Sequence, residues 1–111
     1  MSMVGCKPFY NAAATGSVVG LTKNPASLVW FNVQNTNGST VYLQLFNKRM
    51  ADVTLGTTEP TLTFAVGANG DRIEVFPFPT QFDTALSYAV TTTKDGNTSP
   101  GSTCVVQGGR I

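Results

Sequence analysis

The alternation of apolar and polar residues predicts short β-strands along the whole chain. The two clearest runs are Leu28–Gln34 and Thr40–Phe46, and an Asn-Gly dipeptide at residues 37 and 38 lies between them. Such alternation is typical of a half-buried strand, and Asn-Gly accepts the positive φ angles of a tight hairpin turn. We therefore predict an antiparallel hairpin. Its core face is expected to consist of Val29, Phe31, Val33, Val41, Leu43 and Leu45.

Six further segments carry a strand signal, and turn residues separate them. They are Met3–Tyr10, Ser17–Leu21, Thr61–Val66, Asp71–Phe76, Leu86–Thr93 and Thr103–Gln107. Ile73 and Val75 are expected to point inward, after a turn at Asn69-Gly70. No segment keeps a helical period of useful length. About eight short strands without a helix predict an all-β fold, an antiparallel β-sandwich of jelly-roll-like type.

Three segments are expected to lie outside central strands. Phe76-Pro77-Phe78-Pro79 cannot be central, because proline has no N–H to donate to a ladder, and Pro8 marks the first strand as an edge for the same reason. The run Ala12–Ala14 is expected to be a loop or a single turn, and Gly108-Gly109 to loosen the end of the chain.

Length and composition limit the classes of function. The chain of 111 residues has the size of one domain. We divide it into residues 1–27, an N-terminal arm with the first strands that could dock onto a partner, and residues 28–111, the body of the sandwich. Charged residues make up 12% and the net charge is +1, so we expect no nucleic-acid partner and weak protection against self-association. No apolar run is long enough for a membrane span, and no secretory signal is recognisable, which predicts synthesis in a cytoplasm.

Candidate catalytic chemistry is sparse. The absence of His excludes a Ser-His or Cys-His nucleophile, and no motif supports a Ser-Lys pair. Asp71 and Glu74 are three residues apart and would face opposite sides of a strand. A calcium site near Asn69 and Asp71 would lack the dense acidic loop that such sites use, and zinc ligands are missing. We therefore expect no enzyme activity, no catalytic residues, no metal and no cofactor.

The two cysteines, Cys6 and Cys104, lie near opposite ends of the chain. One interpretation is two buried thiols on neighbouring terminal strands, since free cysteine is among the most buried residue types. The other is a disulfide that closes the chain ends in oxidising surroundings.

The order of the pieces resembles a family of small structural proteins of tailed phages. Members have a turn-containing segment that ends in Leu-(Tyr/Phe)-Asn-Lys, as Leu45–Lys48 does here, and a later strand of the kind Leu-X-Tyr-Ala-Val-Thr, as in Leu86–Thr91. The pieces in this chain are Asn35–Lys48, Val53–Pro60, Thr61–Val66, Val75–Phe82 and Thr84–Thr93, and the match covers residues 28–107. The resemblance implies a capsid decoration (cement) protein located in the virion, on the capsid surface. Its partners would be the major capsid protein and further copies of itself, as a dimer or trimer.

Six aromatic residues are candidates for an interface. Trp30, Tyr42 and Phe46 lie on the second face of the expected hairpin, which needs a cover if the first face is the core; the two faces could also be exchanged. Phe76, Phe78 and Phe82 form a second cluster, interpreted either as a corner of the fold or as a rigid segment that lies on a partner. Two alternatives to a cement protein remain open. One is a head-completion or tail accessory protein, and the other is a carbohydrate-binding β-sandwich in which Trp30, Tyr42 and Tyr88 stack on sugar rings.

Overall fold

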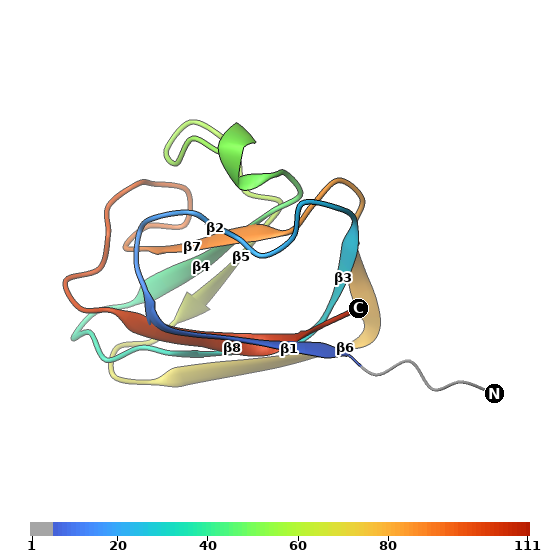
Figure 1. The fold of residues 1–111 in the computed structure, drawn as a ribbon. Helices are drawn as coiled ribbons and strands as arrows, with labels where there is room; N and C mark the ends of the chain where they lie inside the picture. The colour runs from blue at the N-terminus through green and yellow to red at the C-terminus, as the bar shows by residue number, and fades with distance from the viewer. Residues whose placement is uncertain (1–5) are drawn as a thin grey trace.

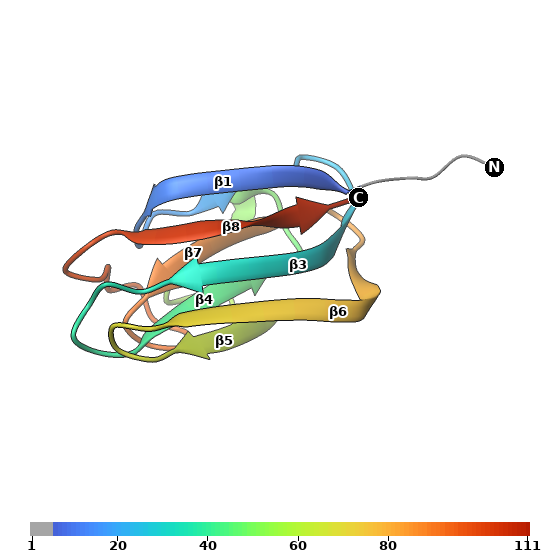
Figure 2. The same ribbon diagram turned by 90° about the horizontal axis from the view of Figure 1, so that it is seen from below.

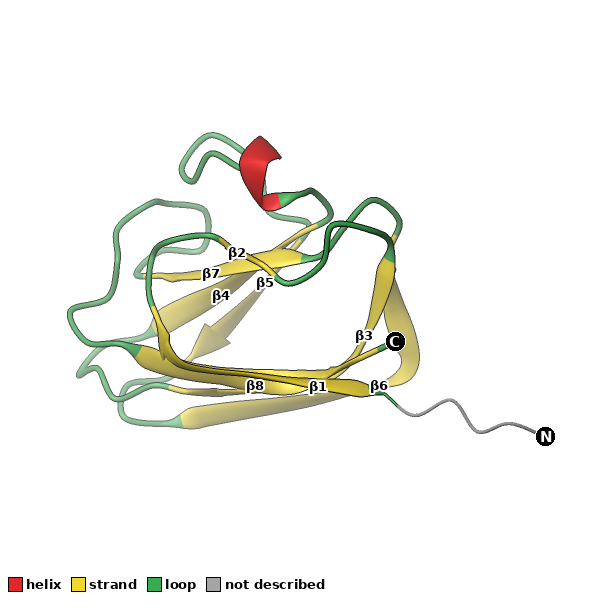
Figure 3. Ribbon diagram, viewed as in Figure 1, coloured by secondary structure: helices red, strands yellow, loops and turns green. Residues whose placement is uncertain are grey.

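The computed structural model describes residues 6–111 and shows an all-β fold of two antiparallel four-stranded sheets (Figure 1). Sheet A contains, in spatial order, β1 (Lys7–Ala14), β8 (Cys104–Arg110), β3 (Ala26–Gln34) and β6 (Asp71–Phe82). Sheet B contains β2 (Val19–Gly20), β7 (Ser87–Thr91), β4 (Val41–Phe46) and β5 (Leu62–Val66). The short 3-10 turn η1 (Met50–Asp52) is the single helical element of the described residues (Figure 3). The predicted all-β sandwich is confirmed.

The strands are wound as a jelly roll. The first four strands pair antiparallel with the last four in reverse order, as β1 with β8, β2 with β7, β3 with β6 and β4 with β5. Successive strands therefore alternate between the two sheets, except at β4 and β5, where the chain turns back on itself. This double winding of eight strands defines the jelly roll, so the finer prediction is confirmed as well.

The predicted hairpin between residues 28–34 and 40–46 is wrong, because β3 lies in sheet A and β4 in sheet B. Among the described residues, the only positive φ angles belong to Asn69 and Gly56. Asn37-Gly38 therefore does not form the tight turn that its sequence favours. The segment crosses from one sheet to the other instead.

Buried asparagine amides hold this crossing in place. The Asn35 Nδ2 donates hydrogen bonds to the carbonyls of Ser39 (2.9 Å) and Gly67 (3.0 Å). The Asn37 Nδ2 donates to the Ser102 carbonyl (3.1 Å), and the Ser102 N–H donates to Asn37 Oδ1 (2.7 Å). These bonds satisfy backbone groups of three separate connections.

The core lies between the sheets and is almost entirely apolar. It is built from Ala14, Ala26, Leu28, Phe31, Val33, Val41, Leu43, Leu45, Val66, Phe82, Leu86, Tyr88, Val90, Cys104 and Val106. Five of the six residues predicted for the core face are in this set, and Val29 is not. The reason is a β-bulge between Leu28 and Trp30, which shifts the alternation so that Leu28 is buried in the place expected for Val29.

The bulge marks a bend of sheet A. In β6, the four residues 76–79 lie opposite the single residue Val29, since Leu28 pairs with Thr80 and Trp30 with Val75. Figure 1 shows β3 and β6 curving at this end from sheet A towards sheet B. The two prolines fall where the ladder is interrupted, on an edge strand, which confirms that this segment is not a central strand.

Ile73 and Val75 point outward, contrary to the prediction, with exposed fractions of 63% and 67%. The pleat of β6 is set by Phe76, whose ring packs inside at 6.2 Å from that of Phe31. Because side chains alternate along a strand, Val75 and Ile73 must lie on the opposite face from Phe76.

The terminal strands differ from expectation in two further respects. Residues 3–5 of the predicted first strand lie outside the described residues, and β1 is an edge strand, as Pro8 indicated. Ala12–Ala14 belongs to β1 and is not a loop, although the register shifts between Asn11 and Ala14. β1 belongs to sheet A and β2 belongs to sheet B. The docking role of residues 1–27 stays a prediction.

Gly108 and Gly109 do not loosen the tail but lie within β8. A Cβ on Gly108 would lie 2.7 Å from the ring of Phe9, and one on Gly109 would lie 2.6 Å from the indole nitrogen of Trp30. Glycine at both positions lets an aromatic ring lie directly on the backbone, one on each face of the sheet.

Both cysteine thiols are free. Cys104 is buried, as predicted, whereas Cys6 is exposed, and the prediction of its burial is wrong. Cys6 precedes Lys7, which pairs with Arg110 at one end of sheet A, and Cys104 pairs with Ala14 at the other end. The two thiols are therefore held apart by the length of β8.

Candidate functional site

The six aromatic candidates occupy different environments. Phe46 and Phe82 are fully buried, Trp30, Tyr42 and Phe76 are half-buried, and Phe78 is 86% exposed. Phe46 and Phe82 therefore have no surface to offer a partner. Trp30 lies on the outside of sheet A and Tyr42 on the outside of sheet B, so the two do not belong to one surface.

The chain itself covers the outer face of sheet B over β7 and the second half of β4. Five residues there are buried although they point away from the core; they are Gln44, Phe46, Ser87, Ala89 and Thr91. Thr63 and Ala65 of β5, on the same face, are exposed. The loops 47–61 and 92–103 lie over this face (Figure 1). The Ser87 hydroxyl donates a hydrogen bond to the Lys48 carbonyl of the first loop at 2.9 Å. The second face of β4, which needed a cover on sequence grounds, thus has one.

Gln44 fastens the second of these loops. Its Nε2 donates to Thr91 Oγ1 (2.6 Å) and to the Gly96 carbonyl (3.0 Å). Its Oε1 is buried and has no hydrogen-bond partner among the described residues. An uncharged amide that is itself fully buried acts as a structural clamp and is not placed to act on a substrate.

The outer face of sheet A is open, and Figure 2 looks onto it. Pairing across the four strands brings together Pro8, Tyr10, Trp30, Asn32, Gln34, Asp71, Ile73, Val75, Val105, Gln107 and Gly109. We call this set the sheet A outer face. Three large apolar side chains of this face are mostly exposed, with exposed fractions of 66% for Tyr10, 63% for Ile73 and 67% for Val75. Asp71 is the only charged residue in the set.

Polar groups in the middle of this face are already paired. The Gln107 Nε2 donates to Asn32 Oδ1 at 3.2 Å, and the Asn32 Nδ2 donates to the Arg72 carbonyl at 3.4 Å. The indole of Trp30 lies on the backbone of Gly109, beside the thiol of Cys6. Seven of the eleven residues of this face are therefore apolar, aromatic or glycine, and the amides of Asn32 and Gln107 in its middle are hydrogen-bonded to each other.

The bent corner of β6 presents a second exposed feature, which we call the edge segment (residues 76–79). Phe78 is 86% exposed and lies between two exposed prolines. Phe76 fixes the segment from below, with its ring 6.3 Å from that of Phe64. The prolines restrict φ, so the aromatic side chain is displayed on a stiff backbone.

Arg72 and Glu74 close the open side of the sandwich next to this segment. Arg72 Nη2 lies 2.7 Å from Glu74 Oε1, and the guanidinium lies over the ring of Phe64 at 5.2 Å from its centroid. Each charge already has its partner, which is the arrangement of a structural ion pair and not of an acid-base dyad.

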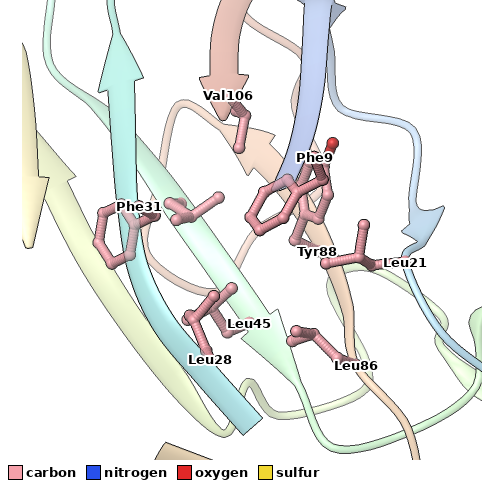
Figure 4. A pocket seen from close by; sticks show the side chains of 9 residues that line it. Phe9, Leu21, Leu28, Phe31, Leu45, Leu86, Tyr88 and Val106 are labelled. Carbon is pink, nitrogen blue, oxygen red and sulfur yellow. The ribbon is translucent and has the colours of Figure 1, made fainter. Parts of the chain in front are cut away.

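A small cavity lies between the sheets (Figure 4). Its volume is about 10 Å³, and it is lined by aliphatic and aromatic side chains, among them Leu28, Phe31, Leu45 and Val106. This space holds one water at most, and its apolar walls offer such a water little. It is a packing defect of the core and not a ligand pocket.

Two titratable groups are perturbed, both by burial. Burial raises the pKa of the Tyr88 phenol, against a smaller opposing effect of the hydrogen bond from Asn11. Burial also raises the pKa of the Cys104 thiol, against smaller effects of hydrogen bonds from Asn37 and Thr36. A raised thiol pKa lowers the thiolate fraction, so Cys104 is not an activated nucleophile.

In the part of the chain that the structure describes, neither potential metal ligands nor the three aromatic candidates for sugar stacking gather at one place. Within residues 6–111, no three His, Cys, Asp or Glu side chains lie close enough to hold a metal ion, and no helix is long and apolar enough to cross a membrane. Trp30, Tyr42 and Tyr88 lie on the outside of sheet A, on the outside of sheet B and in the core, so they do not form one stacking platform.

Comparison with family models, with curated protein sequences and with solved structures gives no match to this chain.

The sequence analysis did not single out Tyr10, Ile73 and Val75 as exposed surface residues. The position of Tyr10 on an expected edge strand could have indicated it, whereas Ile73 and Val75 have the pattern of core residues.

Proposed function

We propose that this protein is a non-enzymatic structural protein of a tailed-phage particle, which binds the outside of the capsid and bridges neighbouring capsomers. The observation that carries the proposal is Phe78, an aromatic side chain that is 86% exposed at the corner of the fold and held between two prolines. The resemblance to small phage structural proteins supplies the identity of the partner, the major capsid protein.

An exposed aromatic on a stiff segment suits a contact with another protein. Interfaces are dominated by a few anchors, often aromatic, that fill pockets on the partner. Because Pro77 and Pro79 restrict the backbone in the free protein, little conformational entropy remains to be lost when Phe78 is buried. The open sheet A outer face and the low charge of the chain agree with a protein that works by surface contact.

Repetition strengthens such a contact. A shell presents the same site many times, and a protein that bridges two capsomers gains from the high local concentration of the second site. A single contact through one anchor can therefore be modest while the assembled layer is stable.

The test is rebinding to purified shells that lack this protein. We expect saturable binding at a fixed ratio to the capsid protein, and Phe78→Ala should weaken it about tenfold or more, in the range of interface anchors. Met50→Ala is the matched control, because Met50 is also an exposed apolar residue (52%) but lies on η1, over the opposite sheet. Absence of binding by the wild-type protein, or a few copies per particle, would contradict the cement function; the second result would indicate a head-completion or tail protein.

A further inference from the structure

We propose that Asn69 is a site of spontaneous covalent modification, at which the side-chain amide is lost and aspartate or isoaspartate forms. We propose also that the fold protects the second Asn-Gly pair of the chain, Asn37-Gly38, from the same reaction. The sequence alone does not distinguish the two pairs, since glycine follows asparagine in both. The proposal concerns the isolated protein and does not depend on the capsid contact.

The reaction uses the backbone nitrogen of the residue that follows the asparagine. The nitrogen of Gly70 attacks Cγ of Asn69, a new C–N bond closes a cyclic imide, and the bond from Cγ to Nδ2 breaks. The proton of the Gly70 amide leaves with Nδ2, which is released as ammonia. Water then opens either C–N bond of the imide, which gives aspartate or isoaspartate. Glycine favours the first step because it has no Cβ to hinder the approach.

The surroundings of Asn69 leave this reaction open. Asn69 is exposed in the turn between β5 and β6, and among residues 6–111 no hydrogen bond holds its side-chain amide. The Gly70 N–H donates to the Gly67 carbonyl at 3.2 Å, the long end of the range for such bonds. The amide can therefore turn towards the Gly70 nitrogen through a local movement of an exposed turn.

The surroundings of Asn37 prevent it. Asn37 is buried, and its Nδ2 donates to Asn35 Oδ1 (2.9 Å) and to the Ser102 carbonyl (3.1 Å). Its Oδ1 accepts a hydrogen bond from the Ser102 N–H at 2.7 Å. Ring closure expels Nδ2 and reorients the amide, so these bonds must break and the crossing between the sheets must open first. An opening that costs about 1.4 kcal/mol already slows the reaction about tenfold.

Conversion of Asn69 affects more than its own side chain. The Asn69 N–H donates to the Asn37 carbonyl at 2.9 Å, and the Asn35 N–H donates to the Gly70 carbonyl at 2.7 Å. The turn between β5 and β6 and the crossing from β3 to β4 thus lie side by side at one end of the sandwich (Figure 2). Isoaspartate lengthens the main chain of this turn by a methylene group. Either product adds a negative charge and brings the net charge of the chain from +1 to zero, where a protein is least protected against association.

Ageing of the folded protein in mildly alkaline buffer, followed by mass spectrometry of its peptides, tests the proposal. We expect Asn69 to convert at least about tenfold faster than Asn37. In a parallel sample unfolded in guanidinium chloride, the two asparagines should convert at similar rates, because only the Asn-Gly sequence then acts.

Two matched variants assign the reaction to the Gly70 nitrogen. Gly70→Ala should slow the conversion of Asn69 severalfold, because a methyl group hinders the attack; the nearest atom to a Cβ there is 3.4 Å away, so the turn accommodates it. Gly38→Ala, which meets no atom within 4 Å, should leave the rate at Asn69 unchanged.

Three results would overturn the proposal. They are equal rates at the two asparagines in the folded protein, an Asn69 that stays intact while the unfolded chain is converted, and an unchanged rate at Asn69 in Gly70→Ala. Phe78→Ala, which tests the capsid contact, should convert as the wild type does, so the two proposals fail independently.

Discussion

Gln44 shows how a single buried amide can hold a loop over a sheet. It lies on the side of β4 that points away from the core, and its Nε2 reaches the carbonyl of Gly96 in the covering loop 92–103. The neighbouring Phe46 is buried under the loop 47–61 on the same face. The burial of Gln44 and the burial of Phe46 therefore both depend on the loops that cover this face.

Replacing Gln44 by Met should lower the free energy of unfolding by about 1–3 kcal/mol, because the Gly96 carbonyl and the Thr91 hydroxyl lose a buried donor. Urea denaturation measures this change. Gln81→Met, at an exposed position of β6, is the control and should stay within about 0.5 kcal/mol of the wild type. Equal stabilities of the two variants would show that Gln44 does not clamp the loop.

The buried phenol of Tyr88 should make stability depend on alkaline pH. Its pKa is raised in the folded protein, so the unfolded chain releases this proton at a lower pH than the folded chain does. The unfolded state then binds fewer protons above the ordinary tyrosine pKa of about 10, and the free energy of unfolding falls as the pH rises through that value. The thiol of Cys104 acts in the same direction from the ordinary thiol range upward.

Denaturation at a series of alkaline pH values should show this decrease in the wild-type protein and a smaller decrease in Tyr88→Phe. A variant with an unchanged pH profile would show that the phenol titrates freely in the folded state.

At the scale of elements, the end of β8 illustrates why glycine in a strand can be structural. The two aromatic rings that lie on Gly108 and Gly109 come from β1 and β3, the neighbours of β8 on either side. The strand is flat there because it carries no side chains, and the rings take the space. On the sheet A outer face, Gly109 leaves the space that the Trp30 indole takes.

Gly109→Ala should lower the free energy of unfolding by about 1–3 kcal/mol and change the fluorescence of Trp30, the only tryptophan, since the new methyl group would lie 2.6 Å from its indole nitrogen. Gly38→Ala is the matched control, because no atom lies within 4 Å of a Cβ there and the residue does not need a positive φ. If both variants fluoresce as the wild type does, Trp30 does not lie on Gly109.

At the scale of the whole molecule, the sequence predicts the class of fold better than the partners of each strand. Alternation located all eight strands, because each strand has one face on the core, but β1 ends four residues after the predicted Tyr10 and β6 six residues after the predicted Phe76. It could not assign β3 and β4 to different sheets, since the Asn-Gly signal is local and the amide bonds of Asn35 and Asn37 join distant segments. The bulge at Val29 and the outward turn of Ile73 are likewise set by tertiary packing.

The two candidate surfaces also differ in how far the sequence predicts them. Phe78 could be singled out from its two prolines alone, whereas the sheet A outer face appears only when four strands from both ends of the chain are placed side by side. Burial of Phe46 and Phe82 depends on loops and on the bend of β6, which no local pattern encodes.

The most direct test of the account is an image of the assembled particle at a resolution that traces β-strands. We expect one sandwich at each equivalent position on the outside of the shell, with the edge segment and Phe78 against the capsid protein. A particle that carries this chain at a single site, or only with Phe78 directed into solvent, would contradict the account.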